Sequence, residues 1–257
     1  MSVLEFTFLV LAGIGAGLTG SIAGLASLIS YPALLATGIP PVTANVTNTA
    51  AMVLTGVGSV SASRPELRGQ GRRLVPLAGA AVLGGSAGAA LLLLTPSSAF
   101  ERIVPWLIAG AAVAILIQRP ARELAAEGAR AHAGDRPGDQ WWLPIAVFAI
   151  SIYGGYFGAA AGVLMLATLL LTTGEGLPRS NAMRNVILGV ANSIAAIGFV
   201  LFASIAWSSA LPLAIGLLLG SLIGPRVVRR APQPLLRRVI AVLGLGLAVH
   251  LGIQAYT

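Results

Sequence analysis

The sequence contains no cysteine and no lysine, and charged residues of any kind are scarce. The absence of cysteine excludes a disulfide framework, a thiol nucleophile and a thiolate metal site. Charged residues make up 9 % of the chain and hydrophobic residues 56 %, whereas a soluble domain has about 25 % charged residues to cover its surface. The chain is therefore expected to lie in a lipid bilayer, where an apolar surface is stable.

All 16 basic residues are arginine, and the formal net charge is +8. A nucleic-acid-binding protein spreads basic residues over one solvated face, with aromatic residues between them. Here the arginines are bunched in the short segments between apolar runs, which is typical of the cytoplasmic loops of membrane proteins. We expect a multi-pass protein of the cell (inner or plasma) membrane, with the lipid bilayer rather than nucleic acid as its partner. The first residues lack a basic region, so no cleaved signal peptide is expected.

The apolar residues form eight runs, most of them close to the roughly 20 residues that a spanning helix needs. These runs cover residues 3–37, 42–62, 74–94, 103–118, 141–173, 182–203, 210–223 and 235–254. The first and the fifth are too long for one crossing, because a straight helix of that length would measure about 50 Å against a hydrocarbon core of about 30 Å. Each of these two runs is therefore expected to break.

Glycines near the middle of both long runs indicate where the breaks lie. They are Gly20 and Gly24 in the first run, and Gly158 and Gly162 in the fifth. Glycine destabilises a helix and lets the backbone turn, so each run is predicted to form a re-entrant hairpin or two short paired crossings. Glycines at this spacing also let helices pack closely, and the two roles are compatible.

The chain divides into two similar halves. Residues 1–118 are predicted to form a first membrane repeat, residues 119–140 a cytoplasmic linker with a short helix at 122–130, and residues 141–257 a second repeat. At an offset of 138 residues, Gly20 falls on Gly158 and Gly24 falls on Gly162. Ordered matches of this kind along both halves indicate a duplication.

Two sets of arginines predict how the halves are oriented. One set lies between the second and third runs and the other between the seventh and eighth: Arg64, Arg68, Arg72, Arg73, Arg226, Arg229, Arg230, Arg237 and Arg238. Both sets should be cytoplasmic, which requires halves of opposite orientation. The predicted fold class is an all-α polytopic membrane protein of two inverted repeats, each with a Gly-broken or re-entrant first segment plus three spanning helices. Transporters built in this way bind substrate near the bilayer midplane.

Helices that begin at half depth direct free N–H groups and a partial positive charge into such a site, which favours an anion. Ser21 is a candidate cap for one of these helix starts. Other polar residues gather where each hairpin leads into the next span. The predicted substrate-binding residues are Ser21, Asn45, Thr47, Asn48, Tyr156, Asn181, Arg184, Asn185 and Asn192. For each of them the alternative role is helix capping or hydrogen bonding between helices.

Arg184 is the most informative of these residues. It lies about a turn inside the sixth run, where a cation is costly unless it is paired or near water. Its planar guanidinium can bind an oxyanion through two N–H groups. The alternative is an interfacial arginine whose side chain extends to the cytoplasmic surface beside Arg179.

Other chemistry has little support in the sequence. No aspartate occurs in a predicted span, and Glu175 lies in a predicted loop, which argues against a proton relay through buried acids. His132 and His250 are isolated, and no GxxxxGK[ST] phosphate loop is present. We therefore expect no metal, no cofactor and no enzymatic activity.

The sequence resembles the sulfite exporter TauE/SafE family of membrane permeases over almost its whole length. The shared pattern is a Gly-rich first span followed by Pro32-Ala33-Leu34, Gly38 and Ala44, and in the second half Gly158-Ala159-Ala160-Ala161-Gly162, Gly176 and Asn181-Ala182-Met183-Arg184-Asn185. The resemblance implies transport of sulfur oxyanions or small organosulfonates, often outward. Composition and spacing alone indicate a transporter compatible with an anion.

The predicted function is a transmembrane permease that exports a small anion, such as sulfite or an organosulfonate, by alternating access around a midplane site. Two alternatives stay open: a channel-like anion facilitator, and a membrane assembly subunit that transports nothing. The exact anion, the coupling ion and the oligomeric state also stay open at this point.

Overall fold

A computed structural model describes the backbone over residues 1–131, 140–227 and 233–256. Within these ranges, the side chains of residues 22–23, 224–227 and 233–237 are outside the description. The central part of the predicted linker and two members of the second arginine set, Arg229 and Arg230, therefore lie outside the described residues. The same holds for the side chains of Arg226 and Arg237.

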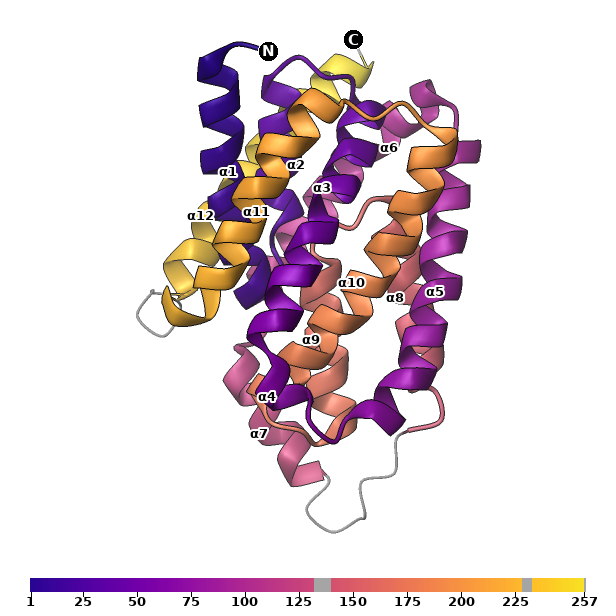
Figure 1. Ribbon diagram of the computed structural model, residues 1–257, viewed down its shortest axis with the longest axis vertical. Coiled ribbons are helices and arrows are strands. Elements are labelled where there is room, and N and C mark those ends of the chain that lie inside the picture. The colour runs from indigo at the N-terminus through magenta and orange to yellow at the C-terminus, as the bar shows by residue number, and fades with distance from the viewer. Residues whose placement is uncertain (132–139, 228–232, 257) are drawn as a thin grey trace.

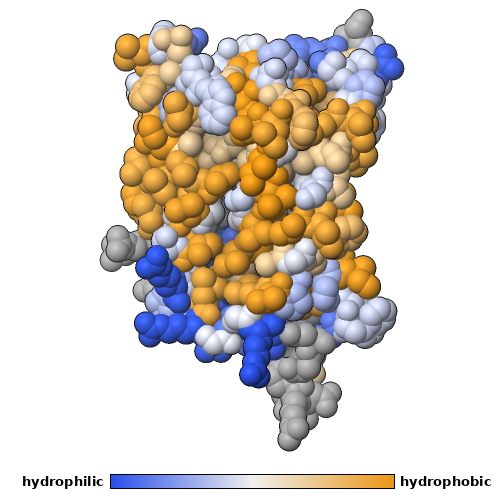
Figure 2. All heavy atoms as spheres, turned by 45° about the vertical axis from the view of Figure 1, so that its right-hand side comes forward, coloured by the Kyte–Doolittle hydropathy of each residue, from blue (hydrophilic) through white to orange (hydrophobic). Residues whose placement is uncertain are grey.

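Every regular element in the described ranges is a helix, which confirms the predicted all-α class. In chain order the helices are α1 (Val3–Ala23), α2 (Ser27–Ala36), α3 (Pro41–Ala62), α4 (Arg64–Leu67), α5 (Gly71–Leu94), α6 (Ser97–Ile117), α7 (Ala121–Ala131), α8 (Leu143–Tyr156), α9 (Ala161–Thr173), α10 (Leu177–Phe202), α11 (Trp207–Val227) and α12 (Gln233–Tyr256). In the described part of the chain, 5 helices are long and apolar enough to cross a membrane. Figure 2 shows a broad apolar band between two more hydrophilic ends, as a multi-pass membrane protein requires.

Helix α3 is as long as the spanning helices but more polar. The polar residues of its first turns are Thr43, Asn45, Thr47, Asn48 and Thr49. From Asn45 onward these side chains are at most 4 % exposed. They face protein rather than lipid, since a polar group in the hydrocarbon region needs a protein or water partner.

The first long run breaks at residues 24–26, between α1 and α2. Gly24 has φ 74°, in the left-handed region that glycine adopts without strain, and its N–H donates to the Gly20 carbonyl at 2.9 Å. Figure 1 shows α1 entering from the end of the molecule that holds both termini, and α2 returning toward that end. The pair therefore forms a helical hairpin with a break at the predicted glycines.

The fifth run breaks at residues 157–160, between α8 and α9. Gly158 has φ 78°, and Ala160, at φ 61°, is also left-handed. The Tyr153 hydroxyl donates to the Ala159 carbonyl at 2.6 Å and closes the turn. In Figure 1 this second hairpin enters from the opposite end, near α4 and α7. Strongly hydrophilic side chains gather at that end in Figure 2. We call it the arginine end, because Arg68, Arg72, Arg73 and Arg179 lie there.

Glycines let the helices before each break pack at very short range. A Cβ added to Gly17 on α1 would lie 2.3 Å from the carbonyl oxygen of Leu217 on α11. Likewise, a Cβ added to Gly88 on α5 would lie 2.2 Å from the carbonyl oxygen of Ile152 on α8. Only glycine fits such contacts, and close packing of small residues is a main source of helix association in lipid.

The two halves interlock. Helix α1 packs along α11 and α8 packs along α5, so each broken segment lies against a helix of the other half. Helices α3 and α10 contact each other, and each also contacts a helix of the other half, α11 and α5 respectively. At the centre the two breaks touch, because a Cβ added to Gly24 or Gly162 would lie 2.5 Å from the Cα of the other glycine.

The short helix predicted in the linker is present as α7. It packs against α9, where Leu124 joins Leu166 and Leu170 in a small apolar cluster. The first part of the linker is therefore docked on the second helical hairpin.

Candidate functional site

A cavity of about 60 Å³ lies where the two breaks meet helices α3 and α10. A cavity of this size holds a few water-sized groups, since one water needs at least about 10–15 Å³. The four glycines predicted to break the helices all line it. The polar lining residues are Ser27, Thr49, Thr55, Ser59, Arg184, Asn185 and Asn192.

The N-terminal ends of two half-length helices contribute to the cavity wall. Ala26 and Ser27 come from the start of α2, and Ala161 and Gly162 from the start of α9. A helix N-terminus carries a partial positive charge and N–H groups without helical partners. These two helix starts therefore favour negative charge on their side of the cavity.

Among the described residues, Arg184 on α10 is the largest fully buried side chain, with 1 % of its surface exposed. Its Nη2 donates to the carbonyl oxygens of Gly20 at 2.9 Å and Ser21 at 3.0 Å, in the last turn of α1. Nη2 also donates to Asn185 Oδ1 at 2.8 Å. This burial is incompatible with the interfacial alternative, in which the guanidinium would extend to the surface beside Arg179.

The Arg184 guanidinium uses only part of its donor capacity. Its Nη1 is buried and has no hydrogen-bond partner, and no aspartate or glutamate appears among the described residues that line the cavity. Partial negative charge at the C-terminal end of α1 offsets some of the cation. None of the described lining residues supplies a full negative charge to balance Arg184.

Two asparagines connect the halves across the centre. On α3, Asn45 Nδ2 donates to the Tyr156 carbonyl at the end of α8 at 2.8 Å. On α10, Asn181 Nδ2 donates to the Ser21 carbonyl near the end of α1 at 3.1 Å. Each amide thus satisfies a carbonyl that a broken helix leaves without a helical partner. The Oδ1 atoms of both residues are buried and have no partner.

The remaining predicted residues surround the cavity without lining it. Thr47 Oγ1 accepts from the N–H of Ala206, just before α11, at 3.1 Å. Asn48 Nδ2 donates to Ser27 Oγ at 3.3 Å. Tyr156 offers its carbonyl to Asn45, and its ring packs edge-on against Phe100. Of the predicted residues, Arg184, Asn185 and Asn192 line the cavity.

The prediction that Ser21 caps a helix start is wrong. Ser21 lies in the last turn of α1, and its hydroxyl donates to the Leu18 carbonyl at 3.1 Å. The chain turns at Gly24, where φ becomes positive, rather than at Gly20. The contribution of Ser21 is its carbonyl, which accepts from both Arg184 and Asn181.

Four lining residues were missed as site residues from the sequence. Thr55 and Ser59 follow Asn48 and Met52 along one face of α3, at the spacing of helical turns. Ser27 and Thr49 complete the set. The helical spacing of polar residues on α3 was a readable signal. Thr55 Oγ1, like Arg184 Nη1, is buried without a partner.

Comparisons with known proteins find relatives among membrane transporters. The model of the sulfite exporter TauE/SafE family matches residues 9–251. The probable membrane transporter protein YfcA of Escherichia coli K12 is 26 % identical over 245 residues, which cover 92 % of this chain and 85 % of that protein. The probable membrane transporter protein ORF9 of a Sinorhizobium species is 26 % identical over 253 residues, which cover 95 % and 91 %. No solved structure matches the chain.

Proposed function

This chain belongs to the sulfite exporter TauE/SafE family of membrane transporters, and we propose that it exports a small oxyanion, such as sulfite or an organosulfonate, by alternating access. As a multi-pass protein it lies in the membrane, which in bacteria is the plasma membrane. The substrate would bind in the central cavity, between the two breaks and helices α3 and α10.

The observation that carries the proposal is the buried Nη1 of Arg184, which has no partner beside a cavity without a carboxylate in its described lining. An unsatisfied buried neutral donor costs about 1–3 kcal/mol, and a charged one costs more. An oxyanion would accept from Nη1 and supply the counter-charge. Thr55 Oγ1 would donate a further hydrogen bond, and the starts of α2 and α9 would add partial positive charge.

The remaining lining groups would hold the anion without trapping it. Asn185, Asn192 and Ser59 are uncharged hydrogen-bonding residues. Because Arg184 is the single cation in the described lining, the bound anion faces one full charge rather than a cluster. A transport site has to release its substrate, and this composition suits that need.

We further propose that the two membrane halves are inverted repeats that rock against each other about the broken helices. Support comes from the two hairpins, which enter from opposite ends of the molecule, and from the matching pairs α1 with α11 and α8 with α5. The arginine end would face the cytoplasm. A membrane potential that is negative inside then drives an anion outward without proton coupling.

Sulfite flux from proteoliposomes tests the proposal directly. In Arg184→Lys the positive charge is kept, but one ammonium cannot reproduce both nitrogens of the guanidinium. We expect sulfite flux to fall about tenfold or more, as the loss of one charge-assisted hydrogen bond implies. Flux should saturate with sulfite concentration; a strictly linear dependence would contradict alternating access and favour a channel-like facilitator.

Two further variants complete the experiment. Arg119→Gln is the matched control, because Arg119 forms a surface ion pair with Glu127 and its side chain is 58 % exposed; flux should stay unchanged. Thr55→Val keeps the shape of the side chain but removes the unpaired hydroxyl, and flux should fall about threefold while the protein stays folded. Unchanged flux in both Arg184→Lys and Thr55→Val would refute the central site.

A further inference from the structure

A second charged depression, of about 480 Å³, opens at the arginine end of the molecule, away from the central cavity. Its walls are the loop that leads into α5, the loop between α9 and α10, and the first turns of α5 and α10. Its charged residues are Arg68, Arg72, Arg73, Arg179 and Glu175. Among the described lining residues, four arginines and one carboxylate give a formal charge of +3.

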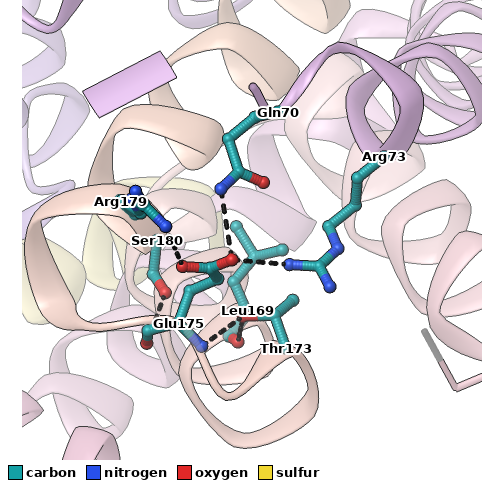
Figure 3. A network of polar contacts seen from close by, with 7 residues as sticks. All are labelled: Gln70, Arg73, Leu169, Thr173, Glu175, Arg179 and Ser180. Atoms are coloured by element: carbon teal, nitrogen blue, oxygen red, sulfur yellow. Dashed lines mark hydrogen bonds and ion pairs between the residues drawn. The ribbon is translucent and has the colours of Figure 1, made fainter. Parts of the chain in front are cut away.

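Glu175 ties these walls together (Figure 3). Its Oε1 accepts from Gln70 Nε2 at 3.1 Å and from Arg73 Nη1 at 3.0 Å, both in the first half of the chain. Its Oε2 accepts from Arg179 Nη1 at 3.1 Å, in the second half. The Arg73 and Glu175 side chains are 14 % and 20 % exposed, so they are partly withdrawn from solvent, unlike ordinary loop charges.

The electrostatics of Glu175 show that this pocket favours an anion. Partial burial by itself would raise the pKa of the carboxyl, but hydrogen bonds from Gln70 and Arg179 and the charges of Arg179 and Arg73 outweigh it. The pKa of Glu175 is therefore lowered on balance, and the group is a carboxylate at neutral pH. Arg68 and Arg72, both exposed, line the same depression, and neither forms a hydrogen bond or ion pair with Glu175.

We propose that this depression is a second anion site, which binds an oxyanion between the arginines next to Glu175. The oxyanion belongs either to a free solute or to a lipid headgroup, since both present terminal oxygens to arginine. Charges needed only for topology would not have to converge on one partly buried carboxylate. The site goes beyond the proposed function, because it lies at the end of the molecule and does not involve Arg184.

An anion in this site competes with Glu175 for Arg73 and Arg179. Because Glu175 links Gln70 and Arg73 of the first half to Arg179 of the second, the competition weakens a contact between the halves. Removing the carboxylate should therefore strengthen anion binding. If the arginines served only to orient the protein in the membrane, there would be no reason for anion binding to strengthen when the carboxylate is removed.

A single fluorescent label can report on the site, because the chain has no cysteine of its own. Gly71 is the label position: it is exposed, begins α5, and has open space where a Cβ would be added. Labelled Gly71→Cys protein in nanodiscs of zwitterionic lipid is titrated with sodium sulfate and, at matched ionic strength, with sodium chloride. We expect a saturable response to sulfate that chloride does not reproduce.

Variants then assign the response. Arg72→Gln with Arg73→Gln should weaken sulfate binding about tenfold or more, and Glu175→Gln should strengthen it several-fold. Arg184→Lys should leave it unchanged, so failure of the central site and failure of this one are separable. The expected fold of each variant is checked by size-exclusion chromatography.

Discs that contain phosphatidylglycerol distinguish the two sources of the oxyanion. If this lipid alone produces the response and blocks sulfate, the headgroup is the occupant. If sulfate still titrates normally, the free solute is the occupant. If sulfate matches chloride in both the native protein and Glu175→Gln, and phosphatidylglycerol changes nothing, the inference is overturned.

Discussion

The two helix breaks share one backbone design but differ in charge. At the first, Gly24 is left-handed and the end of α1 accepts hydrogen bonds from the Arg184 guanidinium. At the second, Gly158 and Ala160 are left-handed and the end of α8 accepts from the neutral amide of Asn45. In both cases the donor lies on the first full-length helix of the other half, α10 or α3.

The difference shows how two similar helix breaks can carry different charges. At the offset that pairs the glycines of the two breaks, Arg184 falls on Val46, which is 1 % exposed and apolar. A carbonyl end can thus be satisfied by a charged or by a neutral donor, and this molecule uses one of each. The cavity between the breaks receives one cation, placed on the side of α1.

Adding a methyl group where the two breaks touch should have the largest effect on the stability of the protein. In Gly24→Ala, the residue would have to hold φ 74° and its Cβ would lie 2.5 Å from Gly162. We expect a loss of about 3 kcal/mol, from left-handed strain together with overpacking. Gly162→Ala meets the same contact without the left-handed strain and should lose about 2 kcal/mol. Thermal melting in detergent measures both.

Gly15→Ala is the matched control for these variants. Gly15 also lies on α1, but a Cβ there would have nothing within 4 Å. Alanine should stabilise the helix slightly, by up to about 1 kcal/mol. Equal melting temperatures for Gly162→Ala and Gly15→Ala would mean that the two breaks do not touch in the folded protein.

The position of each break was predictable, because it depends on local backbone chemistry. Glycines in the middle of runs too long for one crossing indicated both breaks, although the choice between Gly20 and Gly24 needed the backbone angles. The expectation for Ser21 was wrong because the chain turns at Gly24, three residues after Ser21. Ala160 gave no signal at all, since alanine rarely adopts a left-handed conformation.

The roles of the polar residues were less predictable, because they depend on how each helix is rotated and on contacts across the halves. Arg184 stood out as a cation inside a span, but its partners lie 163 and 164 residues away, at Ser21 and Gly20. Asn45 and Asn192 looked alike in the sequence, yet Asn192 lines the cavity and Asn45 bonds the end of α8. Sequence spacing cannot separate these roles.

Removing the two bridging amides one at a time should change stability by an intermediate amount, and the two losses compare the hydrogen-bond donors at the two breaks. Asn45→Ala leaves the buried Tyr156 carbonyl without its amide donor, so we expect a loss of about 1–2 kcal/mol. Asn181→Ala costs less, about 0.5 kcal/mol, because Arg184 still donates to the Ser21 carbonyl. Thermal melting of the two variants side by side gives the difference.

This pair can also fail in an informative way. In an Arg184→Lys background the Ser21 carbonyl has lost its guanidinium donor, and Asn181→Ala should then become about as costly as Asn45→Ala. If Asn181→Ala is already the more damaging change in the native background, the guanidinium is not the main donor to the end of α1.

The smallest expected effect concerns Ala160, whose φ of 61° is the one left-handed value of a non-glycine residue in the described ranges. Glycine there removes about 1–2 kcal/mol of backbone strain. Glycine also stabilises the unfolded chain by about 0.4–1 kcal/mol, because it increases that chain's conformational entropy. It removes a methyl group, 2 % exposed, whose burial stabilises the folded protein by about 0.8 kcal/mol. These contributions nearly cancel, so Ala160→Gly should change stability by less than about 0.5 kcal/mol. Ala161 is the control position, since it is also buried, at 3 % exposure, but has no left-handed strain. Ala161→Gly should lower stability by about 1.5 kcal/mol. Equal losses at the two positions would show that Ala160 carries no strain for glycine to relieve.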